Sequence, residues 1–169
     1  MEKISCDYLS WKELWKMKRV LALLVAGALI VLSPASCIAK VPEAQISLGG
    51  IVPGVTLNSV KAIYGEPVPS RDGETWIFSN GLVIKVDDDF PEIVEEVSIY
   101  SANGTIATPA GISIGMKDTA LNVAYGSADD IDYEHDGVEY TYYSDDMNKK
   151  MEFKVKNNVV VKIKCELRG

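Results

Sequence analysis

Apolar and polar residues alternate with helical spacing in a short stretch that begins near residue 56. Val60, Ile63 and Tyr64 are spaced i, i+3, i+4, which places them on one face of a helix. Thr56 can cap the start of this helix, and Gly65 can supply the left-handed residue that ends it. A helix of about two turns is not stable in water by itself, so it must pack on another element.

The same pattern returns 61 positions later in the chain. The stretch from Gly111 to Gly126 aligns without a gap with the stretch from Gly50 to Gly65, and five positions are identical. Leu121 and Tyr125 keep the helical spacing, while Lys117 stands where the first stretch has its capping Thr. A repeat bounded by glycines predicts a duplicated structural unit.

Strands with a period of two residues follow each predicted helix. An Asp-Gly turn precedes an aromatic strand in each unit, and a hairpin of alternating apolar and polar residues comes next. The alternation places inward Trp76, Phe78, Leu82, Ile84, Val86, Val97 and Ile99 in the first unit, and Tyr140, Tyr142, Met151, Phe153, Val155, Val159, Val161, Ile163 and Cys165 in the second.

These elements predict an α+β fold made of two tandem helix-then-antiparallel-hairpin units, over residues 48–107 and 108–169. Each unit is expected to contribute three strands. A unit of ~60 residues buries little core, so the two units are expected to share one antiparallel sheet with the short helices on one face. Residues 40–47 are expected to form an extended tether before the first unit.

The N-terminal 39 residues have the pattern of a signal peptide. The run from Val20 to Leu32 has 13 apolar residues, follows Lys18 and Arg19, and precedes a patch of small residues. This is shorter than the ~20 residues of a membrane-spanning helix but matches the roughly 7–15 of a signal-peptide core. Met17 opens a conventional signal, which favours residues 1–16 as a start-site artefact; the alternative is a long cytoplasmic flank with the run kept as an anchor.

Two processing outcomes follow from the small-residue patch. Cleavage after Ala39 would leave Lys40 as the mature N-terminus. Lipidation of Cys37 is the less favoured alternative, because Pro34 stands where a lipobox normally has Leu. Without residues 1–39 the formal charge changes from −7 to near −9, which disfavours nucleic acid and anionic lipid as partners. Only Cys165 remains with certainty, so no internal disulfide framework is expected.

The repeated glycine, the Tyr-Gly at each helix end, the aromatic strand and the apolar hairpin resemble the SmpA/OmlA (BamE-like) family of small bacterial envelope proteins. The duplication is similar in layout to the β-lactamase inhibitor protein. This resemblance implies a protein of the periplasm or cell envelope that acts by protein contacts and without catalysis. It does not imply a particular partner, and the lipid-anchoring Cys of the family would correspond to Cys37.

Candidate catalytic and metal-binding residues are few. His135 is the single histidine and lies in an acidic stretch expected to be an exposed loop, away from a Ser or Cys nucleophile. The acidic clusters at 87–89, 129–132 and 145–146 do not have the ligand spacing of an EF-hand and are expected to be charged hairpin tips. Cys165 is expected to be a buried apolar residue rather than a reactive thiol. We therefore expect a non-enzymatic protein without a cofactor or bound metal.

The outward positions of the strands are the candidate binding surface. Tyrosine and apolar side chains there have no core to fill if the helices cover the other face, and such residues often anchor protein interfaces. The candidate protein-binding residues are Ile77, Val83, Tyr100, Tyr143, Lys154, Lys156, Lys162 and Lys164, the four lysines forming a basic stripe. An ordinary solvated sheet face with edge-protecting lysines explains the same pattern equally well.

Taken together, the pattern predicts an exported protein-binding or envelope-assembly module with an unidentified protein partner. The alternative is an inhibitor of an extracellular hydrolase, which differs in that the partner loses activity on binding. An enzyme with an unrecognised site is disfavoured, since one histidine and scattered carboxylates offer little catalytic chemistry.

Overall fold

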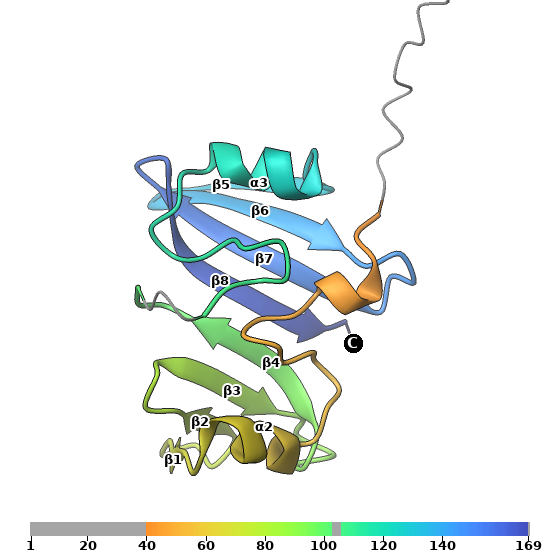
Figure 1. The fold of residues 1–169 in the computed structure, drawn as a ribbon, viewed down its shortest axis with the longest axis vertical. Helices are drawn as coiled ribbons and strands as arrows, with labels where there is room; N and C mark the ends of the chain where they lie inside the picture. The colour runs from red at the N-terminus through yellow and green to blue at the C-terminus, as the bar shows by residue number, and fades with distance from the viewer. Residues whose placement is uncertain (1–39, 103–105, 169) are drawn as a thin grey trace, which may run out of the picture. The chain divides into compact units, whose positions relative to one another are not determined.

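One eight-stranded antiparallel sheet dominates the computed structural model, which describes residues 40–102 and 106–168 (Figure 1). The strands lie in the order β1-β2-β3-β4-β8-β7-β6-β5. Their bounds are β1 (Val68–Pro69), β2 (Thr75–Ile77), β3 (Leu82–Val86), β4 (Val94–Ile99), β5 (Asp130–Glu134), β6 (Gly137–Tyr143), β7 (Lys149–Lys156) and β8 (Val159–Leu167). The helices are η1 (Glu43–Gln45), α2 (Leu57–Tyr64) and α3 (Thr119–Tyr125).

The predicted fold class was wrong, because the described residues form a single continuous sheet with two short helices rather than two tandem helix-and-hairpin units. Strand β4 pairs with β8, so Val97 lies opposite Cys165 and Ile99 lies opposite Ile163. This pairing supplies backbone hydrogen-bond partners to the facing edges of β4 and β8, and it joins both halves of the chain around one core.

Each half also contributes four strands where three were expected. Strand β1 has only two residues, one of them Pro69, and is too short to show a period of two. Strand β5 covers the acidic stretch that was expected to be an exposed loop before His135. Its carboxylates alternate with Ile131 and Tyr133, which is the period of two of a strand, but the charge of this segment led to its interpretation as a loop.

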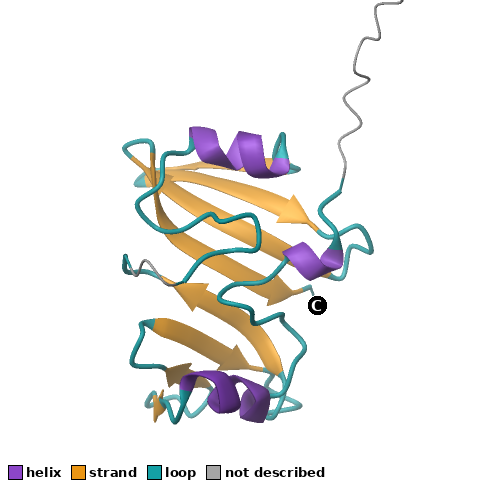
Figure 2. Cartoon of the chain, in the orientation of Figure 1, coloured by secondary structure: helices purple, strands orange, loops and turns teal. Residues whose placement is uncertain are grey.

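The core lies between the apolar side of the sheet and the two helices. Tyr64 at the end of α2 packs against Phe78, with ring centroids 6.2 Å apart. Tyr125 at the end of α3 packs against Tyr142 and Phe153, at 5.3 and 5.8 Å. Figure 2 shows the two helices at opposite ends of the strand order. Both helices therefore hold the same face of the sheet through an aromatic residue.

Local sequence signals account for the ends of α2. The Thr56 hydroxyl accepts a hydrogen bond from the amide of Ser59 at 3.3 Å, which confirms the predicted cap. Gly65 follows the helix with φ of 82°, a conformation that costs glycine little. Helix α3 begins after Asp118, whose side chain makes no capping hydrogen bond.

A bulge changes the alternation in the last hairpin. The register between β7 and β8 shifts at Lys154 and Val155, so Val160 is fully buried. Val159 and Val161, which were expected to point inward, are half-buried instead. An extra residue in one strand shifts every following side chain to the other face, and a strict period of two cannot anticipate it.

Residues 40–47 do not form the extended tether that was expected. They contain the 3-10 turn η1, Val41 bridges to Ser144, and Ile46 is fully buried. The signal region 1–39, with the lipidation candidate Cys37, lies outside the described residues. Among the residues that are described, no helix is both long and apolar enough to span a membrane.

Candidate functional site

Three rows of side chains cross the sheet on the side opposite the core. The strand registers place the residues of a row side by side, with one residue from each strand that the row crosses between β2 and β6. We call this surface the open face. Its rows are Thr75, Lys85, Glu96, Glu166, Lys150 and Tyr143; Ile77, Val83, Ser98, Lys164, Glu152 and Thr141; and Tyr100, Lys162, Lys154 and Glu139.

Four alternating charges occupy the centre of the open face. Lys164 forms ion pairs with Glu152 and, at 3.0 Å, with Glu166. Lys150 contacts the same two carboxylates, each at 2.7 Å. Burial alone would raise the pKa of Glu152, but the hydrogen bonds from Lys150 and Lys164 outweigh it and lower that pKa. The four residues form a closed, locally neutral cluster that fixes their side chains.

The other lysines of the predicted basic stripe have different environments. Lys154 contacts Glu134 and Asp136, each at 2.7 Å, and these hydrogen bonds raise its pKa. Lys162 lies over the ring of Tyr100, 5.1 Å from its centroid. Lys156 is exposed at the end of β7. With Lys164 in the central cluster, the stripe is half neutralised by carboxylates.

An apolar group lies at the β2–β4 end of the open face. Ile77 is 46% exposed and lies directly opposite the half-buried Val83. Tyr100, 55% exposed, follows the end of β4 in the neighbouring row. We call Ile77, Val83 and Tyr100 the apolar end. No helix among residues 40–102 and 106–168 covers it, so these side chains face solvent.

Tyr143, the fourth aromatic or apolar candidate, lies elsewhere on the open face. Its ring is held between Lys40 and Arg168, whose charges are 5.3 and 4.6 Å from the centroid. Strand β6 is five positions from β2 in the sheet order, which separates Tyr143 from Ile77 by roughly 24 Å. The structure therefore divides the predicted site into an apolar end and a separate cation-bound tyrosine.

Sequence reasoning missed the acidic half of this surface. Glu152 and Glu166 were not singled out, although Glu152 shares the outward phase of Lys154 one step along the same strand. Ser98 is fully buried on the open face, and its hydroxyl has no hydrogen-bond partner within the described part of the chain. Ser98 lies between Val83 and Lys164 in its row, and the long stem of a lysine commonly covers a neighbouring group in this way.

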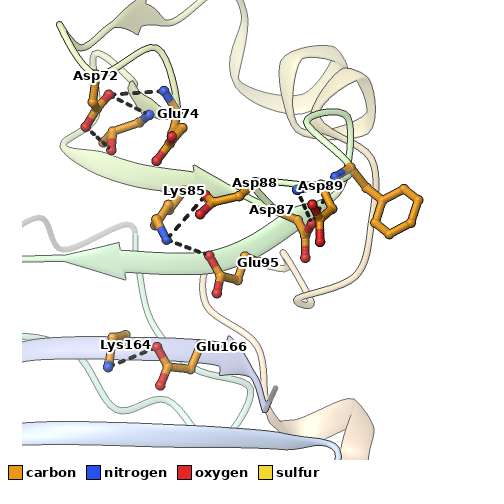
Figure 3. A network of polar contacts seen from close by, with 11 residues as sticks. Asp72, Glu74, Lys85, Asp87, Asp88, Asp89, Glu95, Lys164 and Glu166 are labelled. Carbon is orange, nitrogen blue, oxygen red and sulfur yellow. Dashed lines mark hydrogen bonds and ion pairs between the residues drawn. The ribbon is translucent and has the colours of Figure 1, made fainter.

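Figure 3 shows how other carboxylates near this surface are used. Lys85 reaches the Glu95 carboxylate at 2.8 Å, and the Asp72 carboxylate accepts the amides of Glu74 and Thr75. The Asp87 carboxylate likewise accepts the amides of Asp89 and Phe90. Asp72 and Asp87 therefore hold turns together, as short polar side chains commonly do, whereas Glu95 forms an ion pair between β3 and β4.

The other residues considered for catalysis or metal binding, Cys165 and His135, lie in surroundings that do not favour either role. Cys165 is fully buried on β8, and burial raises the pKa of its thiol, which keeps it protonated. His135 lies in the exposed turn between β5 and β6. Within the ranges that the structure describes, there is no group of three or more His, Cys, Asp or Glu residues placed to hold a metal ion.

Comparisons with known proteins identify a shared fold and no family. No family model matches the sequence, and no curated protein matches it. A cysteine-rich secretory protein from Staphylococcus aureus is 11% identical with a TM-score of 0.52, over 77% of this chain and 48% of that one. At that identity the likeness shows the fold alone.

Two further solved structures are more distant. A DUF4309 family protein from Bacillus subtilis is 13% identical with a TM-score of 0.47, over 67% of this chain and 78% of that one. An extracellular protein containing an SCP domain from Bacillus anthracis is 14% identical with a TM-score of 0.42, over 67% of this chain and 43% of that one. The chain spans less than half the length of the Staphylococcus aureus and Bacillus anthracis proteins.

Proposed function

We propose that this chain is an exported, non-enzymatic protein-binding or envelope-assembly module that docks its partner on the open face. The observation that carries the proposal is the apolar end, where Ile77 and Tyr100 are about half exposed around Val83. Exposed apolar and tyrosine side chains gathered on one surface are typical anchors of protein interfaces.

The charges of the open face have a different part in this proposal. Lys150, Glu152, Lys164 and Glu166 already satisfy one another. A partner that buries such pairs must remove their water, so they contribute orientation and specificity more than affinity. Lys156 and Lys162 have no carboxylate partner among the described residues and can steer an acidic partner. The apolar end is therefore where most of the binding energy is expected.

Export is supported by the sequence rather than by the geometry. The 13-residue apolar run with its basic flank and small-residue patch matches a signal peptide. The structural neighbour from Staphylococcus aureus is described as a secretory protein. The resemblance to the SmpA/OmlA family, which rests on the repeated helix with its Tyr-Gly end, supports our proposal that the module acts in the bacterial envelope, free or anchored through Cys37.

Site-specific crosslinking in intact cells tests the docking surface. A photoreactive benzoylphenylalanine at Tyr100 is expected to capture a discrete protein. The same group at Val123, which is 88% exposed on α3, is the control and should capture nothing specific. Equal capture at both positions, or none at Tyr100, contradicts the proposal.

Substitution of the anchors then measures their contribution. We expect Ile77→Ala combined with Tyr100→Ala to weaken capture at least roughly tenfold while the fold stays intact, because both side chains point away from the core. Ile63→Ala, at a 60% exposed apolar residue on α2, is the matched control. Full binding by the double variant contradicts the proposal. If the captured protein is a hydrolase and loses activity on binding, the module is an inhibitor.

A further inference from the structure

The two edges of the sheet are built differently. At one edge, β1 has two residues and includes Pro69, which has no amide hydrogen to offer. At the other edge, β5 has five residues, all exposed, and no proline. No segment in residues 40–102 or 106–168 pairs with the outer side of β5. One edge is therefore closed to strand addition, whereas the other is open.

The backbone of β5 presents hydrogen-bonding groups on that outer side. A two-residue turn at His135 and Asp136 joins β5 to β6 and closes on the pair Glu134 and Gly137. The closing pair of such a hairpin exchanges both of its backbone hydrogen bonds, and alternate pairs along the ladder do not. The amide and carbonyl groups of Ile131 and Tyr133 consequently point away from β6, in the direction from which a further strand would add. The Ile131 amide donates to the Asp130 carboxylate at 2.9 Å, so an added strand would replace that contact.

Side chains on β5 separate by chemistry onto the two faces of the sheet. Ile131 and Tyr133 lie on the same side as the core, opposite Tyr140 and Val138, yet they are 41% and 80% exposed. The three carboxylates Asp130, Asp132 and Glu134 lie on the side of the open face. The strand therefore offers an apolar surface on one face and an acidic surface on the other.

A pair of facing carboxylates on β5 and β6 indicates that the acidic side of β5 can accept a further positive charge. Asp132 lies directly opposite Glu139, an arrangement that destabilises a sheet unless a cation lies close by. Burial raises the pKa of the Glu139 carboxyl, repulsion from Glu152 and Glu134 contributes in the same direction, and attraction to Lys164 and Lys162 opposes them only in part. Lys154 lies opposite Glu139 on β7, but its ammonium group contacts Glu134 and Asp136. In the described part of the chain, neither Asp132 nor Glu139 forms an ion pair.

We propose that β5 binds an extended segment of another protein by strand addition, and that this segment alternates Lys or Arg with apolar or aromatic residues. The basic residues would face Asp130, Asp132 and Glu134, and the apolar residues would continue the surface of Ile131 and Tyr133. A second copy of this chain does not fit. If two β5 strands paired antiparallel and each face of the sheet continued across the pair, the carboxylates of one strand would lie opposite the carboxylates of the other.

This site is separate from the apolar end of the open face. Strand β5 and strand β2 lie near opposite edges of the sheet, so a partner on one does not require a partner on the other. Failure of the docking proposal for Ile77 and Tyr100 leaves the β5 inference untouched, and the reverse also holds.

A designed peptide tests strand addition with the natural partner unknown. The probe is a short acetylated and amidated peptide in which Lys alternates with Val and Tyr. Comparison peptides carry Glu in place of Lys, or the same composition with the lysines grouped together. In amide-resolved NMR of the mature protein, we expect the alternating Lys peptide alone to shift the Ile131 and Tyr133 amides and to slow their hydrogen exchange.

Two variants separate backbone pairing from charge. Tyr133→Pro removes an amide that points outward, so binding should be lost while the circular dichroism spectrum is retained. Asp132→Lys should weaken peptide binding at least roughly tenfold, since a like charge would face each incoming Lys. Glu92→Lys makes the same charge change at an exposed residue outside the sheet and should leave binding unchanged.

Four results would overturn the inference. They are equal binding of the Glu peptide, amide shifts that map away from β5, undiminished binding by Asp132→Lys, and a dimer in sedimentation that Tyr133→Pro dissolves. The last result would make a second copy the occupant of the edge. A fifth result, no binding of the alternating Lys peptide at all, would also overturn the inference, and the carboxylates of β5 would then only protect an exposed edge against pairing.

Discussion

Tyr64 and Tyr125 occupy equivalent positions at the ends of the two helices, but their surroundings predict opposite rankings for two substitutions. The Tyr64 hydroxyl donates a hydrogen bond to the Gly49 carbonyl at 2.6 Å. The Tyr125 hydroxyl donates to the Thr108 hydroxyl at 2.6 Å, and that oxygen also accepts the amide of Ile112. Loss of the Tyr125 hydroxyl leaves Thr108 with one partner, and the Ala110 backbone, which also contacts that hydroxyl, belongs to an exposed residue that water can reach. By contrast, no other donor to the Gly49 carbonyl is found in the described residues.

The magnitudes follow from these contacts. Tyr64→Phe should lower the free energy of unfolding by about 1–2 kcal/mol, the cost of a part-buried carbonyl without a donor, and Tyr125→Phe by about 0.5–1 kcal/mol. Truncation to Ala should reverse the order. The Tyr125 ring packs on two aromatic rings and the Tyr64 ring on one. We expect about 4–5 kcal/mol for Tyr125→Ala and about 3 kcal/mol for Tyr64→Ala.

Urea unfolding of the mature protein, followed by far-ultraviolet circular dichroism, measures all four variants under one set of conditions. A common slope with denaturant is needed, because a changed slope would indicate a change in the unfolded state or a loss of two-state behaviour. If the ranking is the same for Phe and Ala, the hydroxyl contacts and the ring contacts do not contribute as the geometry implies. A negligible loss in both Ala variants would show that the helix ends do not anchor the helices to the sheet.

Three further predictions follow from the same structure. Gly49→Ala should cost about 2 kcal/mol, because φ is +59° and a Cβ would lie 2.6 Å from the Tyr64 hydroxyl; an unchanged melting temperature would contradict this. Glu152 has a lowered pKa, so its ion pairs stabilise the fold above its ordinary pKa of 4.5, and this stability is lost as pH falls through the folded-state value. Glu152→Gln should therefore flatten the loss of stability in that pH range, and a pH profile identical to that of the unchanged protein would be contrary evidence. A fragment ending at Ala107 should not unfold cooperatively, because β4 loses its pairing with β8; a sharp transition in that fragment would refute the single core.

The sequence pattern predicts strands well where apolar side chains alternate and poorly where they do not. Leu82, Ile84 and Val97 were placed inward, and all three are fully buried. The pairing of β4 with β8 could not be derived, since register between strands distant in sequence depends on the assembled core. Strand β1, with its proline, does not show an apolar period, and β5 alternates apolar with acidic residues in a segment that was interpreted as a charged loop. These two strands and the β4–β8 pairing complete the single eight-stranded sheet.

The sequence pattern predicts which side chains of the candidate surface point outward, but it does not predict which residues they contact. Alternation correctly assigned Ile77 and Tyr100 to outward, exposed positions. It could not show that Lys154 and Lys164 are bound to carboxylates, because their partners come from other strands or from a turn. The position of Tyr143 between Lys40 and Arg168 likewise depends on both ends of the folded chain. Charge counted along a strand therefore overestimates the charge that the folded surface presents.

The internal sequence repeat has a physical explanation that differs from the one its pattern suggests. The three repeated glycine pairs all have positive φ, between 77° and 98°, which explains why glycine occurs twice at each place. The repeated isoleucines are both 2% exposed, and the repeated tyrosines both use their hydroxyls to hold a neighbouring segment. Every identical position thus lies in a turn or a helix anchor, and none lies in a strand. The pairs are Gly50 and Gly111, Ile51 and Ile112, Gly54 and Gly115, Tyr64 and Tyr125, and Gly65 and Gly126.

This distribution explains how one sheet can carry two different surfaces. The turns and anchors constrain the backbone at both ends of the core, and they place few demands on the outward strand positions. The first half of the chain has exposed Ile77 and Tyr100 on that side, whereas the second half has ion pairs and the acidic edge strand β5. Partner recognition at the apolar end and at β5 can therefore change independently, because neither set of side chains supports the helix anchors.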